Sequence, residues 1–84
     1  MTSPPPPLLI VEDEPDLRQL YTLALVKAGL DAEAVPDLAQ AHARLRERRY
    51  AVVLTDMRLP DGTGLELLRT LTREGRSERA IVIT

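Results

Sequence analysis

Apolar residues follow two patterns that alternate along the chain. Three short runs are continuously apolar and rich in β-branched residues: LLIV at residues 8–11, AVVLT at 51–55 and AIVIT at 80–84. Runs of this length and composition predict strands that are covered on both faces of a sheet. Residues 30–35 instead alternate between apolar and polar side chains, so we expect a weaker strand there, at an edge of the sheet.

Between these runs, apolar residues recur at helical spacing in three segments. The first predicted helix starts at Pro15, and Gly29 follows it where a C-terminal cap is expected. Asp37 and Gln40 resemble a capping box that opens the second helix, and Gly75 ends the third. The apolar positions that define the helices are Leu17, Leu20, Tyr21, Ala24, Leu25 and Ala28 in the first, Leu38, Ala41 and Leu45 in the second, and Leu65, Leu68 and Leu71 in the third.

The predicted order of elements is therefore β-α-β-α-β-α-β. Strands that alternate with helices predict an α/β fold with a parallel sheet and helices on both faces. In such doubly wound sheets, ligands bind at the carboxyl ends of the strands. The residues at these strand ends are the candidate functional residues.

Acidic residues follow two of the buried strands. Glu12 and Asp13 follow the first strand, Asp56 follows the third, and Thr84 ends the last. In the flavodoxin-like strand order, 2-1-3-4-5, the first and third strands are neighbours, so the three carboxylates would meet at one edge. Carboxylates that share a site repel one another, and hard oxygen ligands favour Mg²⁺. The alternative is structural, because acids at residues 12–14 also complement the dipole of the following helix.

The composition of the 84-residue chain limits the classes of function. A net charge of −2 gives no basic field for nucleic-acid binding, and the absence of cysteine excludes disulfides and zinc–thiolate sites. No apolar run is long enough to span a membrane and no secretory signal is found, so we expect a cytoplasmic protein with no nucleic-acid or membrane contacts through this segment. Four consecutive prolines predict that residues 1–7 form an extended, disordered leader.

Three segments together resemble a known family. LLIVEDE at residues 8–14, VVLTDMRLPDGTGLELL at 52–68 and AIVIT at 80–84 are similar to the receiver domain of two-component response regulators. The middle segment resembles receivers of the nitrogen-regulation, PilR-like type. The resemblance covers residues 8–84 and implies a flavodoxin-like (CheY-like) sheet with the strand order 2-1-3-4. The family's fifth strand, with its lysine, and its last two helices have no match in these residues.

The resemblance also assigns roles to the residues at the strand ends. Asp56 would accept a phosphoryl group from a sensor histidine kinase, and Thr84 would supply the switch hydroxyl that binds the new phosphoryl oxygen. Glu12, Asp13, Asp56 and the backbone carbonyl of Met57 would hold Mg²⁺. Glu12 replaces the commoner aspartate, which implies that its contact with the metal passes through water. The chain would be a phosphoacceptor and not a turnover enzyme, and it would regulate an output domain that acts in transcription.

Two other functions stay open on the sequence alone. One is a docking module with the receiver fold that works without phosphorylation, and the other is a small hydrolase that forms an aspartyl-phosphate at Asp56. The complete acidic set favours the phosphoacceptor over the docking module. An open edge at residues 80–84 is also expected to favour self-association of the chain.

Overall fold

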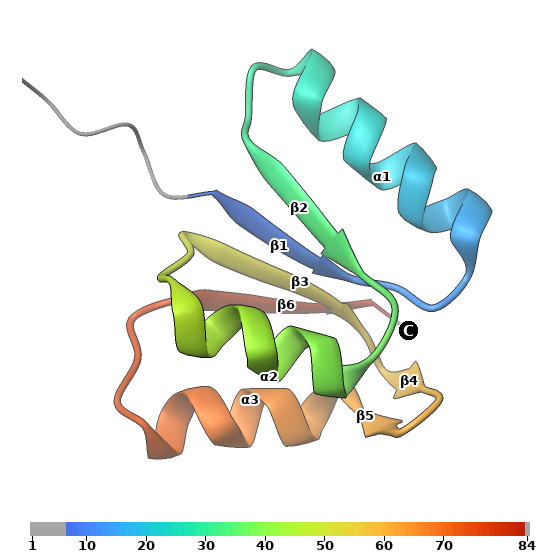
Figure 1. The fold of residues 1–84 in the computed structure, drawn as a ribbon. Helices are drawn as coiled ribbons and strands as arrows, with labels where there is room; N and C mark the ends of the chain where they lie inside the picture. The colour runs from blue at the N-terminus through green and yellow to red at the C-terminus, as the bar shows by residue number, and fades with distance from the viewer. Residues whose placement is uncertain (1–6, 84) are drawn as a thin grey trace, which may run out of the picture.

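The computed structural model describes residues 7–83, whose arrangement is shown in Figure 1. Every strand and helix that the hydrophobic pattern predicts is present. The elements are β1 (Leu8–Val11), α1 (Pro15–Lys27), β2 (Ala32–Val35), α2 (Leu38–Glu47), β3 (Val52–Asp56), β4 (Arg58–Leu59), β5 (Gly62–Thr63), α3 (Gly64–Arg73) and β6 (Arg79–Ile83). The short hairpin of β4 and β5 is an addition, because two-residue strands are too short to produce a periodic signal.

The ends of the chain lie largely outside the described residues. This holds for residues 1–6 of the predicted leader and for Thr84. Pro7 is buried, and its carbonyl accepts a hydrogen bond from the N–H of Ala51 (2.9 Å), just before β3. Among the described helices, none combines the length and apolar character that crossing a membrane requires.

The four longer strands form one parallel sheet in the order β2-β1-β3-β6. This is the predicted flavodoxin-like order, and the weak strand β2 lies at one edge as expected. Val11 pairs with Val35 of β2 on one side and with Thr55 of β3 on the other. Because these parallel strands run in register, the residues that follow β1 lie beside those that end β3.

The predicted helix ends are confirmed by the backbone. Asp37 caps α2, and its carboxylate accepts a hydrogen bond from the N–H of Gln40 (2.8 Å). Gly29 and Gly75 follow α1 and α3 with φ values of 86° and 66°. Glycine adopts this left-handed conformation without the steric penalty of a side chain, which explains why each helix ends there.

The hydrophobic core lies on one side of the sheet. Figure 1 shows α2 and α3 together on one face and α1 on the other. The core is formed by Leu9, Val11, Val35, Leu38, Ala41, Leu45, Tyr50, Val53, Leu59, Leu67 and Leu71. No residue of α1 is buried, and the Leu20 side chain is 59% exposed. The predicted apolar stripe of α1 is therefore helical, but it does not enter the core.

The buried face of α3 differs from the stripe of leucines that defines the helix in the sequence. Gly64, Leu67 and Leu71 are buried, whereas Leu65 is 46% exposed. Of the predicted positions Leu65, Leu68 and Leu71, only Leu71 belongs to the core. The hydrophobic pattern is misleading here because Gly64 packs closely against the sheet without contributing an apolar side chain.

A buried ion pair fastens the loop between α3 and β6 to the amino-terminal edge of the sheet. The guanidinium of Arg76 donates to both carboxylate oxygens of Glu78 (2.9 and 2.6 Å) and to the carbonyls of Leu45 (2.6 Å) and Arg48 (2.9 Å). Glu78 also accepts a hydrogen bond from the N–H of Tyr50 (3.0 Å), and its side chain is fully buried. The pair thus ties the end of α2 and the start of β3 to the residues that lead into β6.

Burial alone would raise the pKa of Glu78, but the hydrogen bonds from Arg76 and from the Tyr50 N–H lower it to about 2. A carboxyl group whose pKa is lower in the folded state stabilises the fold above the pKa of the unfolded chain. This contribution is present above about pH 4.5 and is lost as the pH falls toward 2.

We expect Arg76→Ala to lower the free energy of unfolding by about 3–5 kcal/mol, because it leaves the Glu78 carboxylate buried without its cation. Urea unfolding at pH 7 measures this loss. Arg73→Ala is the matched control, since the Arg73 side chain makes only a long, exposed hydrogen bond to Thr70 (3.4 Å). Equal stability of the two variants would contradict a structural role for the buried pair.

Candidate functional site

Three acidic side chains meet at the carboxyl edge of the sheet. Glu12 and Asp13 follow β1, and Asp56 ends β3. Each residue offers a carboxylate oxygen, and these oxygens lie within 4.8 Å of one another. The register explains this proximity, because Val11 pairs with Thr55 and the next residue of each strand is acidic.

The three carboxylates differ in their exposure. Glu12 is only 3% exposed, whereas Asp56 is half-buried and Asp13 is exposed. Burial raises the pKa of Glu12, and the neighbouring Asp56 carboxylate raises it further. One oxygen of Glu12 accepts a hydrogen bond from the N–H of Glu14 (3.1 Å), which favours the charged form but does not offset the other two effects.

Arg18 of α1 lies close to the acidic cluster, but its guanidinium does not pair with the carboxylates. Arg18 donates to the backbone carbonyls of Glu12 (3.0 Å) and Asp13 (3.4 Å) and thus fixes the turn after β1. Across residues 7–83, the ion pairs are Arg44–Glu47, Arg48–Glu33 and Arg76–Glu78, and none of them involves the acidic cluster. A small divalent cation fits this set of unpaired oxygen donors well, and the all-oxygen chemistry matches Mg²⁺.

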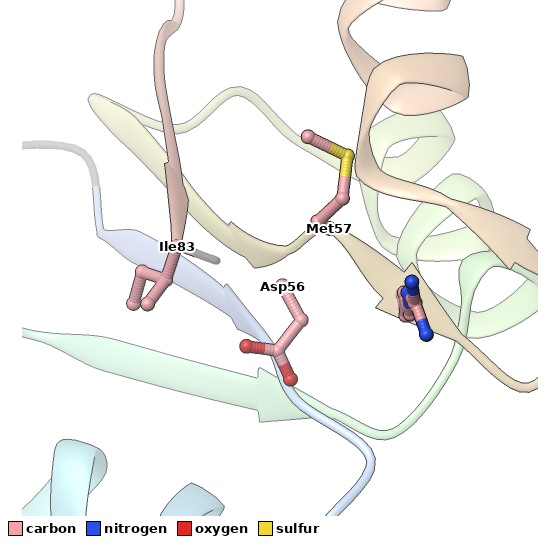
Figure 2. A pocket seen from close by; sticks show the side chains of 4 residues that line it. Asp56, Met57 and Ile83 are labelled. Carbon is pink, nitrogen blue, oxygen red and sulfur yellow. The ribbon is translucent and has the colours of Figure 1, made fainter.

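Asp56 lies beside an open hollow of about 530 Å³ that is also lined by Met57, Arg58 and Ile83. In Figure 2 the Asp56 carboxylate and the Met57 side chain point in different directions, and Ile83 lies on the opposite side from Met57. Asp56 is half-buried and lines the hollow, so it is accessible from solvent, and the side chain of Arg58 brings a positive charge to the same hollow.

The backbone after Asp56 is held in place by Gly64. The N–H of Gly64 donates to the carbonyl of Met57 (2.8 Å). A Cβ atom added to Gly64 would lie only 2.4 Å from the carbonyl oxygen of Asp56. Any side chain at residue 64 would therefore displace the backbone of Asp56, so the site requires glycine at this position.

Sequence reasoning identified the acidic cluster but missed two residues that shape it. Arg18 anchors the turn that carries Glu12 and Asp13, and its helical position next to apolar residues gives no indication of this role. Asp61, in the β4–β5 turn, accepts hydrogen bonds from the N–H groups of Leu38 (2.9 Å) and Ala39 (3.0 Å). The bond from Leu38, and to a smaller extent the bond from Ala39, lowers the pKa of Asp61. No local signal links residues so distant in the sequence. The predicted switch residue, Thr84, lies outside the described residues.

A family model for the response regulator receiver domain matches residues 8–84. The chain belongs to this family. Receiver domains are signalling domains of two-component systems, typically carry a phosphorylated aspartate and bind Mg²⁺ at an acidic site, and are generally not turnover enzymes. The predicted family membership is thus confirmed, and the acidic cluster of this receiver corresponds in chemistry to the family's metal site.

Curated relatives and solved structures agree with this assignment. The response regulator protein PilR of Pseudomonas aeruginosa is 37% identical over 76 residues, which are 90% of this receiver and 17% of the relative. The receiver protein CpdR of Brucella abortus is 34% identical over 77 residues, 92% of this chain and 64% of CpdR. The structure of FixJ-N is 31% identical with a TM-score of 0.85, covering 100% of this chain and 66% of that one. The receiver thus spans less than two thirds of these curated relatives.

Proposed function

We propose that this receiver accepts a phosphoryl group on Asp56 from a sensor histidine kinase. The observation that carries the proposal is that oxygens of three carboxylates lie within 4.8 Å of one another, and that one of these residues, Asp56, lines an open hollow. Glu12, Asp13 and Asp56 would hold Mg²⁺ at this edge. Among solved receivers, MaeR, which is 33% identical to this chain with a TM-score of 0.86, has been obtained with beryllium trifluoride bound.

The proposed reaction is a direct transfer between two side chains. A carboxylate oxygen of Asp56 forms a bond to phosphorus while the bond between phosphorus and the kinase histidine nitrogen breaks, and the freed imidazole keeps the electron pair. Glu12 and Asp13 position their charges beside Asp56, and Arg58 adds a positive charge to the hollow. Bound Mg²⁺ would supply charge neutralisation as the anionic phosphoryl group approaches the three carboxylates.

Two neighbouring backbone carbonyls, those of Met57 and Arg58, are candidates for a further ligand of the metal. The Met57 carbonyl, which the resemblance assigns to the metal, already accepts the hydrogen bond from Gly64. The backbone bends at Met57, between β3 and β4. The carbonyl of Arg58, the first residue of β4, is therefore the alternative ligand, and we infer that it is the better placed of the two.

The names of the relatives support a proposal about the biological output. One relative of Pseudomonas aeruginosa is named as the phosphate regulon transcriptional regulatory protein PhoB, and it is 37% identical to this chain over 67 residues. We infer that the receiver controls transcription through a separate output domain and acts in the cytoplasm. Contact with DNA would belong to that output domain and not to this segment, whose net charge is −2.

Self-association is a further proposal about the partners of the chain. On β6, Ile81 is 53% exposed, and on α1 the side chains of Leu17 and Leu20 are 39% and 59% exposed. An apolar side chain such as Ile81 on an exposed edge strand favours association between copies, because pairing satisfies the backbone and buries the side chain. The leucines of α1 add a second exposed apolar surface, on the helix that packs against β1 and β2.

Incubation with acetyl phosphate and Mg²⁺ should add a single, base-labile phosphoryl group to the chain. Asp56→Asn should abolish it, because an amide is not a usable nucleophile. Intact-protein mass spectrometry measures the label, and Asp31→Asn, remote from the acidic edge, is the control. A label on the Asp56→Asn variant would refute the assignment. A wild-type protein without label would favour the docking module, and steady phosphate release would favour the hydrolase.

Mg²⁺ titration followed by NMR should shift the backbone signals of Glu12, Asp13 and Asp56 first. The carbonyl ¹³C signal of Arg58 should shift more than that of Met57. Binding should weaken at acidic pH, because the raised pKa of Glu12 lets protons compete with the metal. Without metal, the raised pKa of Glu12 makes the fold less stable as the pH rises from the pKa of the unfolded chain through the raised value. Bound metal should recover that loss of stability.

Shifts that are centred on Glu66 or Glu74 of the α3 region would exclude the acidic edge as the metal site. If the carbonyl ¹³C signal of Met57 shifts more than that of Arg58, the Met57 carbonyl is the ligand.

Ile81→Lys should reduce association of the chain at concentrations of about 0.1 mM and above, because it places a charge on the exposed edge. Sedimentation velocity measures the effect, and circular dichroism verifies that the variant is folded. Leu65→Lys is the control, since Leu65 is 46% exposed but belongs to α3 and not to the edge strand. If wild type and both variants sediment alike as monomers, the edge does not mediate association.

A further inference from the structure

The segment from Met57 to Gly64 forms a closed loop at the candidate site. At its base, the N–H of Gly64 donates to the carbonyl of Met57 (2.8 Å). Above the base, β4 and β5 pair in antiparallel fashion, with Arg58 opposite Thr63. The loop therefore begins at the proposed phosphoacceptor and returns directly to the start of α3, so its conformation fixes the backbone on which Asp56 and both candidate carbonyls lie.

The tip of this loop is attached to a different helix. Figure 1 shows the β4–β5 hairpin beside the start of α2. The two carboxylate oxygens of Asp61 accept hydrogen bonds from the N–H groups of Leu38 (2.9 Å) and Ala39 (3.0 Å). These are among the first N–H groups of α2, which have no partner within the helix. Asp37 takes the next one, from Gln40 (2.8 Å).

Apolar packing holds the loop and the helix together at the same point. A Cβ atom on Gly62 would lie 2.5 Å from the Leu38 side chain, so the hairpin and the helix are in close contact. Leu38 and Leu59 are 4% and 9% exposed and belong to the same core. The contact is therefore a packed junction in which Asp61 supplies the polar part.

We propose that Asp61 is a positioning residue, which fixes the loop after Asp56 by binding it to the first turn of α2 and so couples that turn to the phosphoacceptor site. Its carboxylate touches neither the acidic cluster nor the hollow, so it acts through the backbone of the loop. The part of this inference that concerns Mg²⁺ rests on the proposed function. The part that concerns the loop does not, because it follows from the hydrogen bonds alone.

The coupling has a consequence in each direction. If Asp61 holds the loop in the form that binds the metal, removing Asp61 weakens metal binding. By thermodynamic reciprocity, metal binding should then slow hydrogen exchange of the Leu38 and Ala39 amides, and this protection should need Asp61.

The two caps of α2 provide a matched pair for the test. Asp61→Ala and Asp37→Ala each remove a side chain that caps the same helix, but only Asp61 comes from the loop. We expect Asp61→Ala to weaken Mg²⁺ binding about tenfold, as is typical of residues that orient metal ligands. It should also speed hydrogen exchange of the Gly64 amide. Asp37→Ala should destabilise α2 but change both quantities much less than Asp61→Ala does, because the loop keeps its own bonds to the helix. Asp61→Asn, which keeps one acceptor oxygen, should lie between Asp61→Ala and the wild type.

The measurements are Mg²⁺ titration and amide exchange by NMR, at a temperature where all variants are folded. Wild-type affinity and unchanged Gly64 exchange in Asp61→Ala would overturn the proposal. Equal losses in Asp61→Ala and Asp37→Ala would also overturn it, because they would reduce Asp61 to an ordinary helix cap. If the wild type itself bound no Mg²⁺, the proposed function would fail, and the Gly64 exchange rates would still decide whether Asp61 positions the loop.

Discussion

The parallel, in-register pairing of β1 with β3 is the constraint on which the candidate site depends. It sets Val11 opposite Thr55, so the acids that follow lie side by side at one edge of the sheet. The strands are held there by the apolar core between the sheet and helices α2 and α3. Burial of that core provides the free energy that offsets the repulsion among the three carboxylates. The electrostatic repulsion at the site is therefore a local cost in free energy, and the packing of the core offsets it.

Each edge of the sheet has a buried glutamate, and the pKa values of the two glutamates are shifted in opposite directions. At the amino edge, Glu78 is fully buried but bound by Arg76 and by the Tyr50 N–H, and its pKa falls to about 2. At the carboxyl edge, Glu12 is also buried, yet its neighbour is another carboxylate and its pKa is raised. The first arrangement stabilises the fold. The second leaves charge available for a cation, which is the property that a metal-assisted phosphoacceptor needs.

The helical layers are also unequal. Helices α2 and α3 bury their apolar faces, whereas no residue of α1 is buried. The well-packed layer is the one that holds the loop after Asp56, through Asp61 at the start of α2 and through Gly64 at the start of α3. The backbone around Asp56 is therefore built on the well-packed side of the molecule, while apolar side chains of α1 and β6 are exposed.

Local sequence patterns were enough to predict the four longer strands, the three helices, the parallel order of the strands and the three acids at the strand ends. These features follow from local signals: β-branched runs, helical periodicity, capping residues, and acids directly after predicted strands. The family resemblance added the expected roles of those acids, on which the proposed function builds. Four features became visible only in the folded chain. Glu12 is buried beside Asp56, Gly64 must lack a side chain, Leu67 and not Leu65 enters the core, and Asp61 binds the start of α2. Each of these depends on atoms brought together from distant parts of the chain, and such contacts leave no periodic pattern in the sequence.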